Sequence, residues 1–94
     1  MSESEHALRR RDAARSLGLA LRVLRQGKGL SQEQVANAAR VSVYAYGCLE
    51  RGRAPSGGIA NPTMDTLLRV FTALDIEPPH LPKDGSAARI SDRG

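Results

Sequence analysis

The sequence predicts a small all-α protein of four to five helices. Its 94 residues are enough for one domain with one modest core. Only 3% of the residues are aromatic although 40% are hydrophobic, so the core must consist of Leu, Val, Ala and Ile. Apolar residues recur at steps of three and four, and Gly, Ser and Pro separate these periodic segments. These features together favour helices.

The first helix is expected from Asp12 to Gln26, with an earlier start at Ser4 as the alternative. Its apolar stripe would consist of Ala13, Ala14, Leu17, Ala20, Leu21 and Leu24. Gly27 and Gly29 supply the permissive backbone that a helix end requires. Residues 1–11, which include three consecutive arginines, are expected to be either an extension of this helix or a flexible basic arm.

Two short helices follow. Ser31 and Gln34 have capping-box spacing, which predicts a helix from Gln32 to about Ala39 with Val35, Ala36 and Ala39 facing inward. Ser42 is a second N-cap candidate. It predicts a helix from Val43 to about Arg51, ended by Gly52, with Tyr46 and Leu49 facing inward.

The segment "NPTMDTLLRVFTALDI" predicts one more helix, capped by Thr63 or Asn61. Its expected apolar stripe consists of Met64, Leu67, Leu68, Phe71 and Leu74. The prolines of "EPPHLP" cannot continue a helix. We therefore expect a folded domain over residues 12–81 and a disordered tail over residues 82–94.

Positive charge is concentrated in one half of the chain. The formal charge is +4, but residues 1–53 hold ten basic and five acidic side chains, a net +5, and residues 54–94 have a net −1. An arginine-rich half suggests an anionic partner, because the guanidinium fork suits phosphate. The alternative is an ordinary solvated surface.

Several function classes find no support in the sequence. The single cysteine, Cys48, excludes an internal disulfide, and His6 and His80 lie too far from it for a zinc site. No nucleophile and base are positioned together, and no phosphate-binding glycine loop follows a strand. We expect neither catalysis nor a cofactor. No apolar run suggests a membrane span or a secretory signal, so we expect a cytoplasmic protein with no membrane partner.

Two short helices joined by a three-residue turn predict a helix-turn-helix. In that motif the second helix projects steeply from the first and lies in the major groove of DNA. One long helix could not present its exposed face at that angle. The alternation of small and apolar residues at Ala36, Val41, Tyr46 and Leu49 fits two crossing helices.

Residues 17–76 resemble the Cro and phage-repressor (XRE-like) helix-turn-helix family. The resemblance is carried by "LALRVLRQGKGLSQEQVANAA", "VS…LERG" and "NPTMDTLLRVFTALDI", in that order and spacing. It implies a compact, lambda-repressor-like DNA-binding domain.

The resemblance also implies roles for individual residues. Gln32 matches a phosphate-contacting position, with an ordinary first-turn residue as the alternative. The positions at which relatives meet DNA correspond to Ser42, Val43, Tyr44, Gly47 and Cys48. Arg51 and Arg53 would lie near phosphates, and Arg25 and Glu50 match a structural ion pair.

Two departures from the family pattern affect these expectations. Arg40 stands where the turn usually has glycine, so a left-handed backbone there would cost roughly 1 kcal/mol. Positions 43, 44, 47 and 48 hold no Gln, Asn or Arg that could pair with a base through two hydrogen bonds. Base reading would then depend on Val43, the Tyr44 hydroxyl, close approach at Gly47, and DNA shape.

The resemblance implies a transcriptional repressor in the nucleoid, which binds double-stranded DNA at a pseudo-palindromic operator as a homodimer. Dimerisation would use the fourth helix and "IEPPHL". The alternative is a protein-interaction module that resembles HipB-type antitoxins, with a protein partner and secondary autoregulation through DNA.

Overall fold

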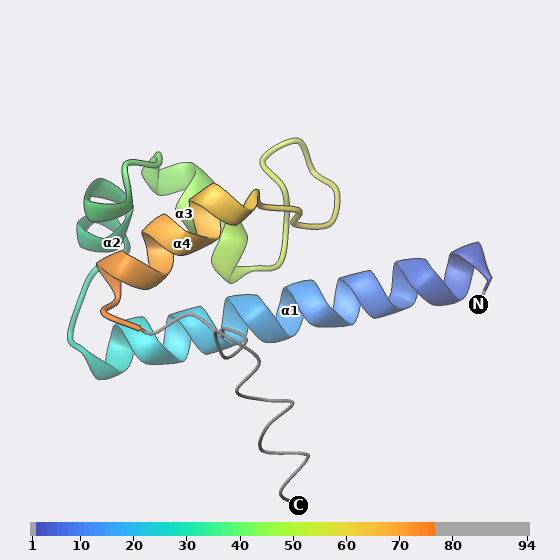
Figure 1. The fold of residues 1–94 in the computed structure, drawn as a ribbon, viewed down its shortest axis with the longest axis horizontal. Helices are drawn as coiled ribbons and strands as arrows, with labels where there is room; N and C mark the ends of the chain where they lie inside the picture. The colour runs from blue at the N-terminus through green and yellow to red at the C-terminus, as the bar shows by residue number, and fades with distance from the viewer. Residues whose placement is uncertain (1, 77–94) are drawn as a thin grey trace, which may run out of the picture.

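Four α-helices form the fold of residues 2–76, the part of the chain that the computed structural model describes. They are α1 (Glu3–Gly27), α2 (Gln32–Ala39), α3 (Val43–Glu50) and α4 (Met64–Ala73). Figure 1 shows α1 as a long rod, with the three shorter helices gathered over its C-terminal part. No strand occurs in this part of the chain beyond one isolated bridge between Arg53 and Ile59. The predicted all-α fold is confirmed.

Helix α1 begins at Glu3, so of the two alternatives expected for residues 1–11, the described residues form the helix extension and not the flexible arm. Ser2 caps the helix by accepting a hydrogen bond from the Glu5 amide at 3.1 Å. The acidic residues in the first turn stabilise the helix through their interaction with the positive N-terminal end of its dipole. Neither Gly nor Pro interrupts residues 3–17. The three arginines at 9–11 therefore lie on a helix that projects past the rest of the fold (Figure 1).

The buried face of α1 differs from the predicted stripe. Ala14 and Leu21 are buried as expected, but Ala13, Ala20 and Leu24 are exposed. Gly18, which was absent from the prediction, is buried. Among the described elements α1 packs mainly on α3, so its packed face is narrower than its apolar face.

The two short helices have the predicted N-termini. Ser31 and Gln34 form both hydrogen bonds of the capping box, at 3.0 and 2.8 Å. Ser42 caps α3 by accepting from the Ala45 amide at 2.9 Å. Between them Arg40 adopts the left-handed conformation, with φ 59° and ψ 42°. This turn therefore carries the expected cost of roughly 1 kcal/mol for a residue other than glycine.

Helix α4 is capped by Thr63, which accepts from the Thr66 amide at 3.1 Å. Its predicted stripe is partly wrong. Leu74 is fully buried, whereas Met64 is 69% and Leu68 42% exposed. The fully buried residue Val70 was not predicted. The helix packs mainly on α2, and its buried side is therefore rotated relative to the apolar stripe.

The core lies between the four helices. Its buried members are Leu21, Val35, Ala36, Ala39, Tyr46, Leu49, Val70 and Leu74. The three buried residues predicted on α2 and the two on α3 all belong to it. The core therefore fixes the angle between α2 and α3.

Two glycines let the end of α3 lie directly on α1. A Cβ atom at Gly18 would be 2.6 Å from the carbonyl oxygen of Leu49 and closer still to that of Glu50. A Cβ atom at Gly52, which has φ 73°, would be 3.1 Å from the Arg15 amide nitrogen. No larger residue fits either position without backbone movement.

The segment "EPPHLP" and the predicted tail over residues 82–94 lie outside the described residues, as does the end of the predicted domain at residue 81. Among the helices formed between residues 2 and 76, none has the length and apolar character to cross a membrane.

Candidate nucleic-acid interface

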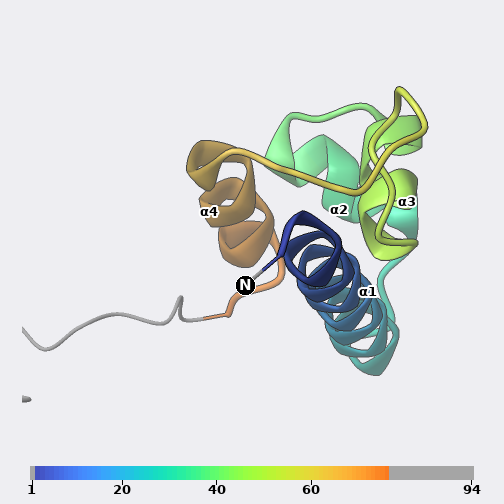
Figure 2. The ribbon, with the colours of Figure 1, turned by 90° about the vertical axis from the view of Figure 1, so that its right-hand side faces the viewer.

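The first turn of α3 presents an exposed surface. Ser42 is exposed at the N-cap, and its hydroxyl is used to cap the helix. Val43 is 39% and Tyr44 65% exposed, whereas Tyr46 on the opposite side is buried in the core. In Figure 2, α3 and the loop after it lie at one edge of the molecule and α4 at the other. The outer side of α3 is therefore uncovered by any described element.

The structure does not place Gly47 and Cys48 on this exposed surface. A Cβ atom at Gly47 would lie 3.4 Å from Arg51 Nη1 and 3.5 Å from Gln32 Oε1, so two side chains cover it. Cys48 is 3% exposed, and its Sγ accepts a hydrogen bond from Arg51 Nη2 at 3.4 Å. The resemblance and the helical spacing placed both residues with Val43 and Tyr44 on one outer face, whereas in the structure both are buried. Contact of Gly47 and Cys48 with DNA is not tested by this burial and stays a prediction.

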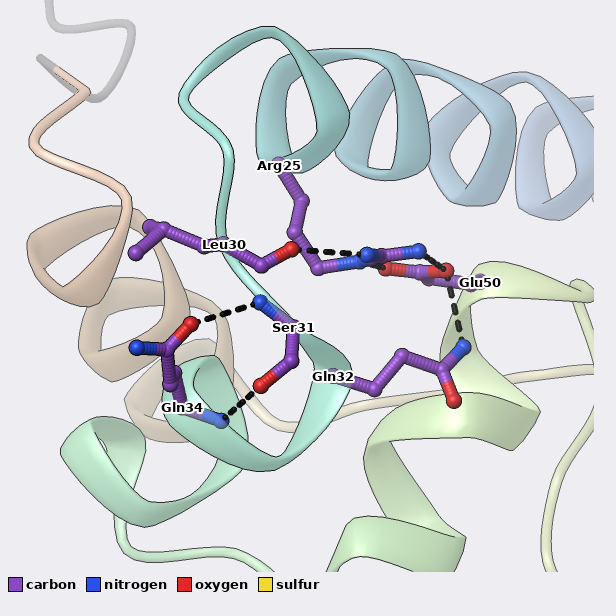
Figure 3. A network of polar contacts seen from close by, with 6 residues as sticks. All are labelled: Arg25, Leu30, Ser31, Gln32, Gln34 and Glu50. Atoms are coloured by element: carbon purple, nitrogen blue, oxygen red, sulfur yellow. Dashed lines mark hydrogen bonds and ion pairs between the residues drawn. The ribbon is translucent and has the colours of Figure 1, made fainter.

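A buried polar network ties the start of α2 and the end of α3 to α1 (Figure 3). Arg25 Nε donates to Glu50 Oε2 at 2.6 Å, and Arg25 Nη2 donates to Glu50 Oε1 at 3.1 Å. The two side chains are 11% and 2% exposed. Arg25 Nη1 also donates to the Leu30 carbonyl oxygen at 2.9 Å. The ion pair that the resemblance implied is thus present, with two-pronged geometry.

Gln32 is also a member of this network, although no pattern in the sequence indicated this contact. Its Nε2 donates to Glu50 Oε1 at 3.0 Å, and its side chain is half-buried at the start of α2. Side chains from α1 and α2 therefore meet at one carboxylate of α3. The network holds the helix-turn-helix on α1 at a fixed angle.

The environment of Glu50 favours its ionised form. Burial disfavours the carboxylate, but hydrogen bonds from Arg25 and Gln32 outweigh this effect, so the pKa of Glu50 is lowered from its ordinary value of 4.5. Burial, together with the nearby Glu50 carboxylate, raises the pKa of the Tyr46 phenol. At neutral pH Glu50 is therefore ionised and the neighbouring Tyr46 is neutral.

The lowered pKa of Glu50 predicts that the fold loses part of its stability in acid. A carboxyl whose pKa is lower in the folded state stabilises the fold above its unfolded pKa and loses that contribution as the pH falls. The free energy of unfolding should therefore decline below about pH 4.5. Chemical denaturation across this range should show a shallower decline in Glu50→Gln than in the wild type. Glu33→Gln, which removes an exposed carboxyl, should retain the wild-type slope; equal slopes in all three proteins would contradict the assignment.

Arg51 and Arg53 are exposed at the end of α3 and in the loop that follows. The Arg53 amide donates to the Cys48 carbonyl oxygen at 2.9 Å, which turns the chain back over α3. The structure brings both residues together with Arg11 and Arg15 of α1 around one open hollow. Sequence reasoning missed Arg15, although its spacing of four from Arg11 places the two on one helix face.

Comparisons with known proteins agree with this geometry. The family profile described as a helix-turn-helix domain matches residues 16–81. Among curated proteins, no sequence matches the chain. Among solved structures, the chain is similar to the restriction-modification controller protein C.AhdI from Aeromonas hydrophila, with 36% identity and a TM-score of 0.61. The match covers 70% of this chain and 91% of that protein.

The matched residues span α2, the turn at Arg40, α3 and α4, together with the C-terminal part of α1 from residue 16. The fold, the order of the helices and the exposed start of α3 are those that a groove-binding motif requires. The chain belongs to the helix-turn-helix family of DNA-binding transcriptional regulators.

Proposed function

We propose that this chain is a sequence-specific repressor that binds a pseudo-palindromic operator as a homodimer, with α3 in the major groove. The observation that carries this proposal is the uncovered first turn of α3, held at a fixed angle by the core and by the Arg25–Glu50–Gln32 network. A helix that is already held in one orientation loses little conformational freedom when it enters a DNA groove, so binding carries a smaller entropy cost.

Base reading would fall to the start of α3. Val43 is an apolar partner for thymine methyl groups, and the Tyr44 hydroxyl can donate or accept at a base edge. Both side chains are exposed, as direct contact requires. Few base contacts of this kind imply that DNA shape contributes to sequence preference.

Phosphate contacts would flank this reading surface. Gln32 lies in the first turn of α2, where free backbone amides and the helix dipole favour an anion. One Nε2 hydrogen bond goes to Glu50, and the amide group has a second N–H to donate. Arg51 and Arg53 supply charge at the end of α3. Gln32 would thus couple phosphate binding to the network that orients α3.

Dimerisation would use the outer side of α4. Met64 and Leu68 are large exposed apolar residues one helical turn apart, and a two-fold contact through them would remove both from water. In a homodimer the two copies of α3 would read half-sites about 34 Å apart. The similarity to a restriction-modification controller protein supports this regulatory role, and the antitoxin-like alternative has no comparable support.

Selection of bound sequences from a random duplex pool tests this function. We expect enrichment of an inverted repeat with half-site centres about 34 Å apart. A gel shift should then show affinity that falls steeply as salt rises. No enriched sequence, or affinity that does not change with salt, would contradict the proposal.

Variants of the interface should separate phosphate contacts from base contacts. Arg51→Ala should weaken binding to all duplexes and reduce the slope of log K against log[salt] by about 1, and Gln32→Ala should also weaken binding to all duplexes. Tyr44→Ala should relax preference at one base pair, by about 1 kcal/mol. Ser16→Ala, an exposed position on α1 outside both proposed contact surfaces, is the control and should bind as wild type. A uniform loss in Tyr44→Ala would contradict its base-reading role.

A further inference from the structure

Four arginines surround an open hollow beside α3. Arg11 and Arg15 come from α1, Arg51 from the end of α3, and Arg53 from the following loop. Gly57 and Gly58 of the same loop form part of the remaining wall. The hollow has a volume of about 320 Å³, and we call it the arginine hollow.

The fold fixes the position of these side chains. Gly52 packs against the backbone of Ala14 and Arg15, so the end of α3 cannot move away from α1 without losing this contact. The antiparallel bridge between Arg53 and Ile59 holds the loop. The Ala60 amide donates to the Gly52 carbonyl oxygen at 3.0 Å and closes the loop at its base. Backbone packing therefore gathers the four arginines, and Arg51 is also held by its hydrogen bond to Cys48 Sγ.

The arginine hollow has an excess of positive charge. Within residues 2–76, the ion pairs are Arg25–Glu50 and Arg69–Asp65, so none of the four arginines pairs with a carboxylate there. Like charges held close together repel, and an anion between them relieves that repulsion. The guanidinium fork favours phosphate oxygens in particular. The arginine hollow is thus complementary to a phosphate group.

The arginine hollow adjoins the proposed DNA interface. Arg51 lies on its wall and also covers Gly47 of α3, next to Gln32. A DNA strand whose phosphate contacts Gln32 and Arg51 would continue toward Arg11 and Arg15. Because the hollow is open, a continuous DNA backbone can pass through it. A small molecule would be better held by an enclosed cavity.

We infer that the arginine hollow binds a backbone phosphate of the DNA just outside the half-site that α3 reads. The N-terminal part of α1 thereby extends the footprint beyond the helix-turn-helix. This inference rests on the proposed function.

The test compares two double variants on two duplexes. Arg11→Gln/Arg15→Gln removes the two α1 charges from the arginine hollow. Arg9→Gln/Arg10→Gln removes the same charge from the same exposed part of α1, but from residues that do not line the arginine hollow. One duplex carries the selected operator with flanking base pairs, and the other is trimmed at the outer edges of the half-sites. Fluorescence anisotropy over a salt series gives the affinity and its salt slope.

We expect Arg11→Gln/Arg15→Gln to reduce the slope of log K against log[salt] by roughly 1 to 2 per protomer on the flanked duplex. On the trimmed duplex it should match Arg9→Gln/Arg10→Gln. Thermal melting should give the same Tm for both variants, because all four positions are exposed.

Three results would overturn the inference. Equal salt slopes for the two variants on the flanked duplex would show that the arginine hollow does not contact DNA, and would leave the proposed function intact. Equal losses on both duplexes would place the phosphate inside the half-site. If the wild type binds neither duplex, the proposed function itself fails.

Discussion

Replacement of Gly18 with alanine is expected to lower the free energy of unfolding by roughly 2 kcal/mol or more. Helix propensity alone predicts the opposite, because alanine in a helix interior is about 1 kcal/mol more favourable than glycine. The added methyl would lie 2.6 Å from the Leu49 carbonyl oxygen and closer to that of Glu50. These are backbone atoms, so no side-chain rotation can relieve the clash.

Gly27→Ala is the matched control, because Gly27 is also in α1 and a Cβ atom there meets nothing within 4 Å. Urea denaturation should find this variant as stable as the wild type or slightly more stable. If Gly18→Ala were equally tolerated, the close approach of α1 and the end of α3 would be wrong.

Arg25→Ala is expected to destabilise the fold by about 3 kcal/mol or more. The substitution leaves the Glu50 carboxylate, 2% exposed, without its charged partner, and it removes the donor to the Leu30 carbonyl oxygen. The loss would be measured by urea denaturation near neutral pH. Destabilisation should also loosen α3 and reduce DNA affinity.

Two comparisons make this result specific. Arg22→Ala, one turn earlier on α1 and exposed, should change stability by less than about 0.5 kcal/mol. The double replacement Arg25→Met/Glu50→Leu should recover much of the lost stability, because no buried charge is left unpaired. A small effect of Arg25→Ala alone would show that the pair is solvated and does not orient α3.

Local signals in the sequence were sufficient to predict α2, α3 and the turn between them. Ser31, Gln34 and Ser42 begin the two helices through side-chain bonds to backbone amides only a few residues away, so the pattern and the structure agree. The left-handed backbone at Arg40 is likewise a local feature, since it belongs to the three-residue turn between α2 and α3.

Contacts between distant segments could not be predicted in the same way. The role of Gly18 depends on the end of α3, some thirty residues later in the chain, and nothing local distinguishes it from a tolerated helical glycine. On α4 the face that packs is rotated relative to the apolar stripe, so Val70 was missed and Met64 was placed inside.

The candidate site was predictable in outline and not in detail. Family positions and helical spacing identified Val43 and Tyr44, which are exposed, but they also suggested Gly47 and Cys48, which are buried. The side chains of Gln32 and Arg51 lie over Gly47. The arginine hollow combines residues from three segments, and no sequence motif indicates such a combination.

The most direct test of the central claim is the amide spectrum of the 15N-labelled protein, recorded with and without the selected duplex. If the first turn of α3 enters the groove, the largest changes should occur at Val43 and Tyr44, followed by Gln32 and Arg51. The amides around Val23, on the exposed side of α1, should change little. An α3 whose amides stay unchanged at saturating duplex would contradict the account.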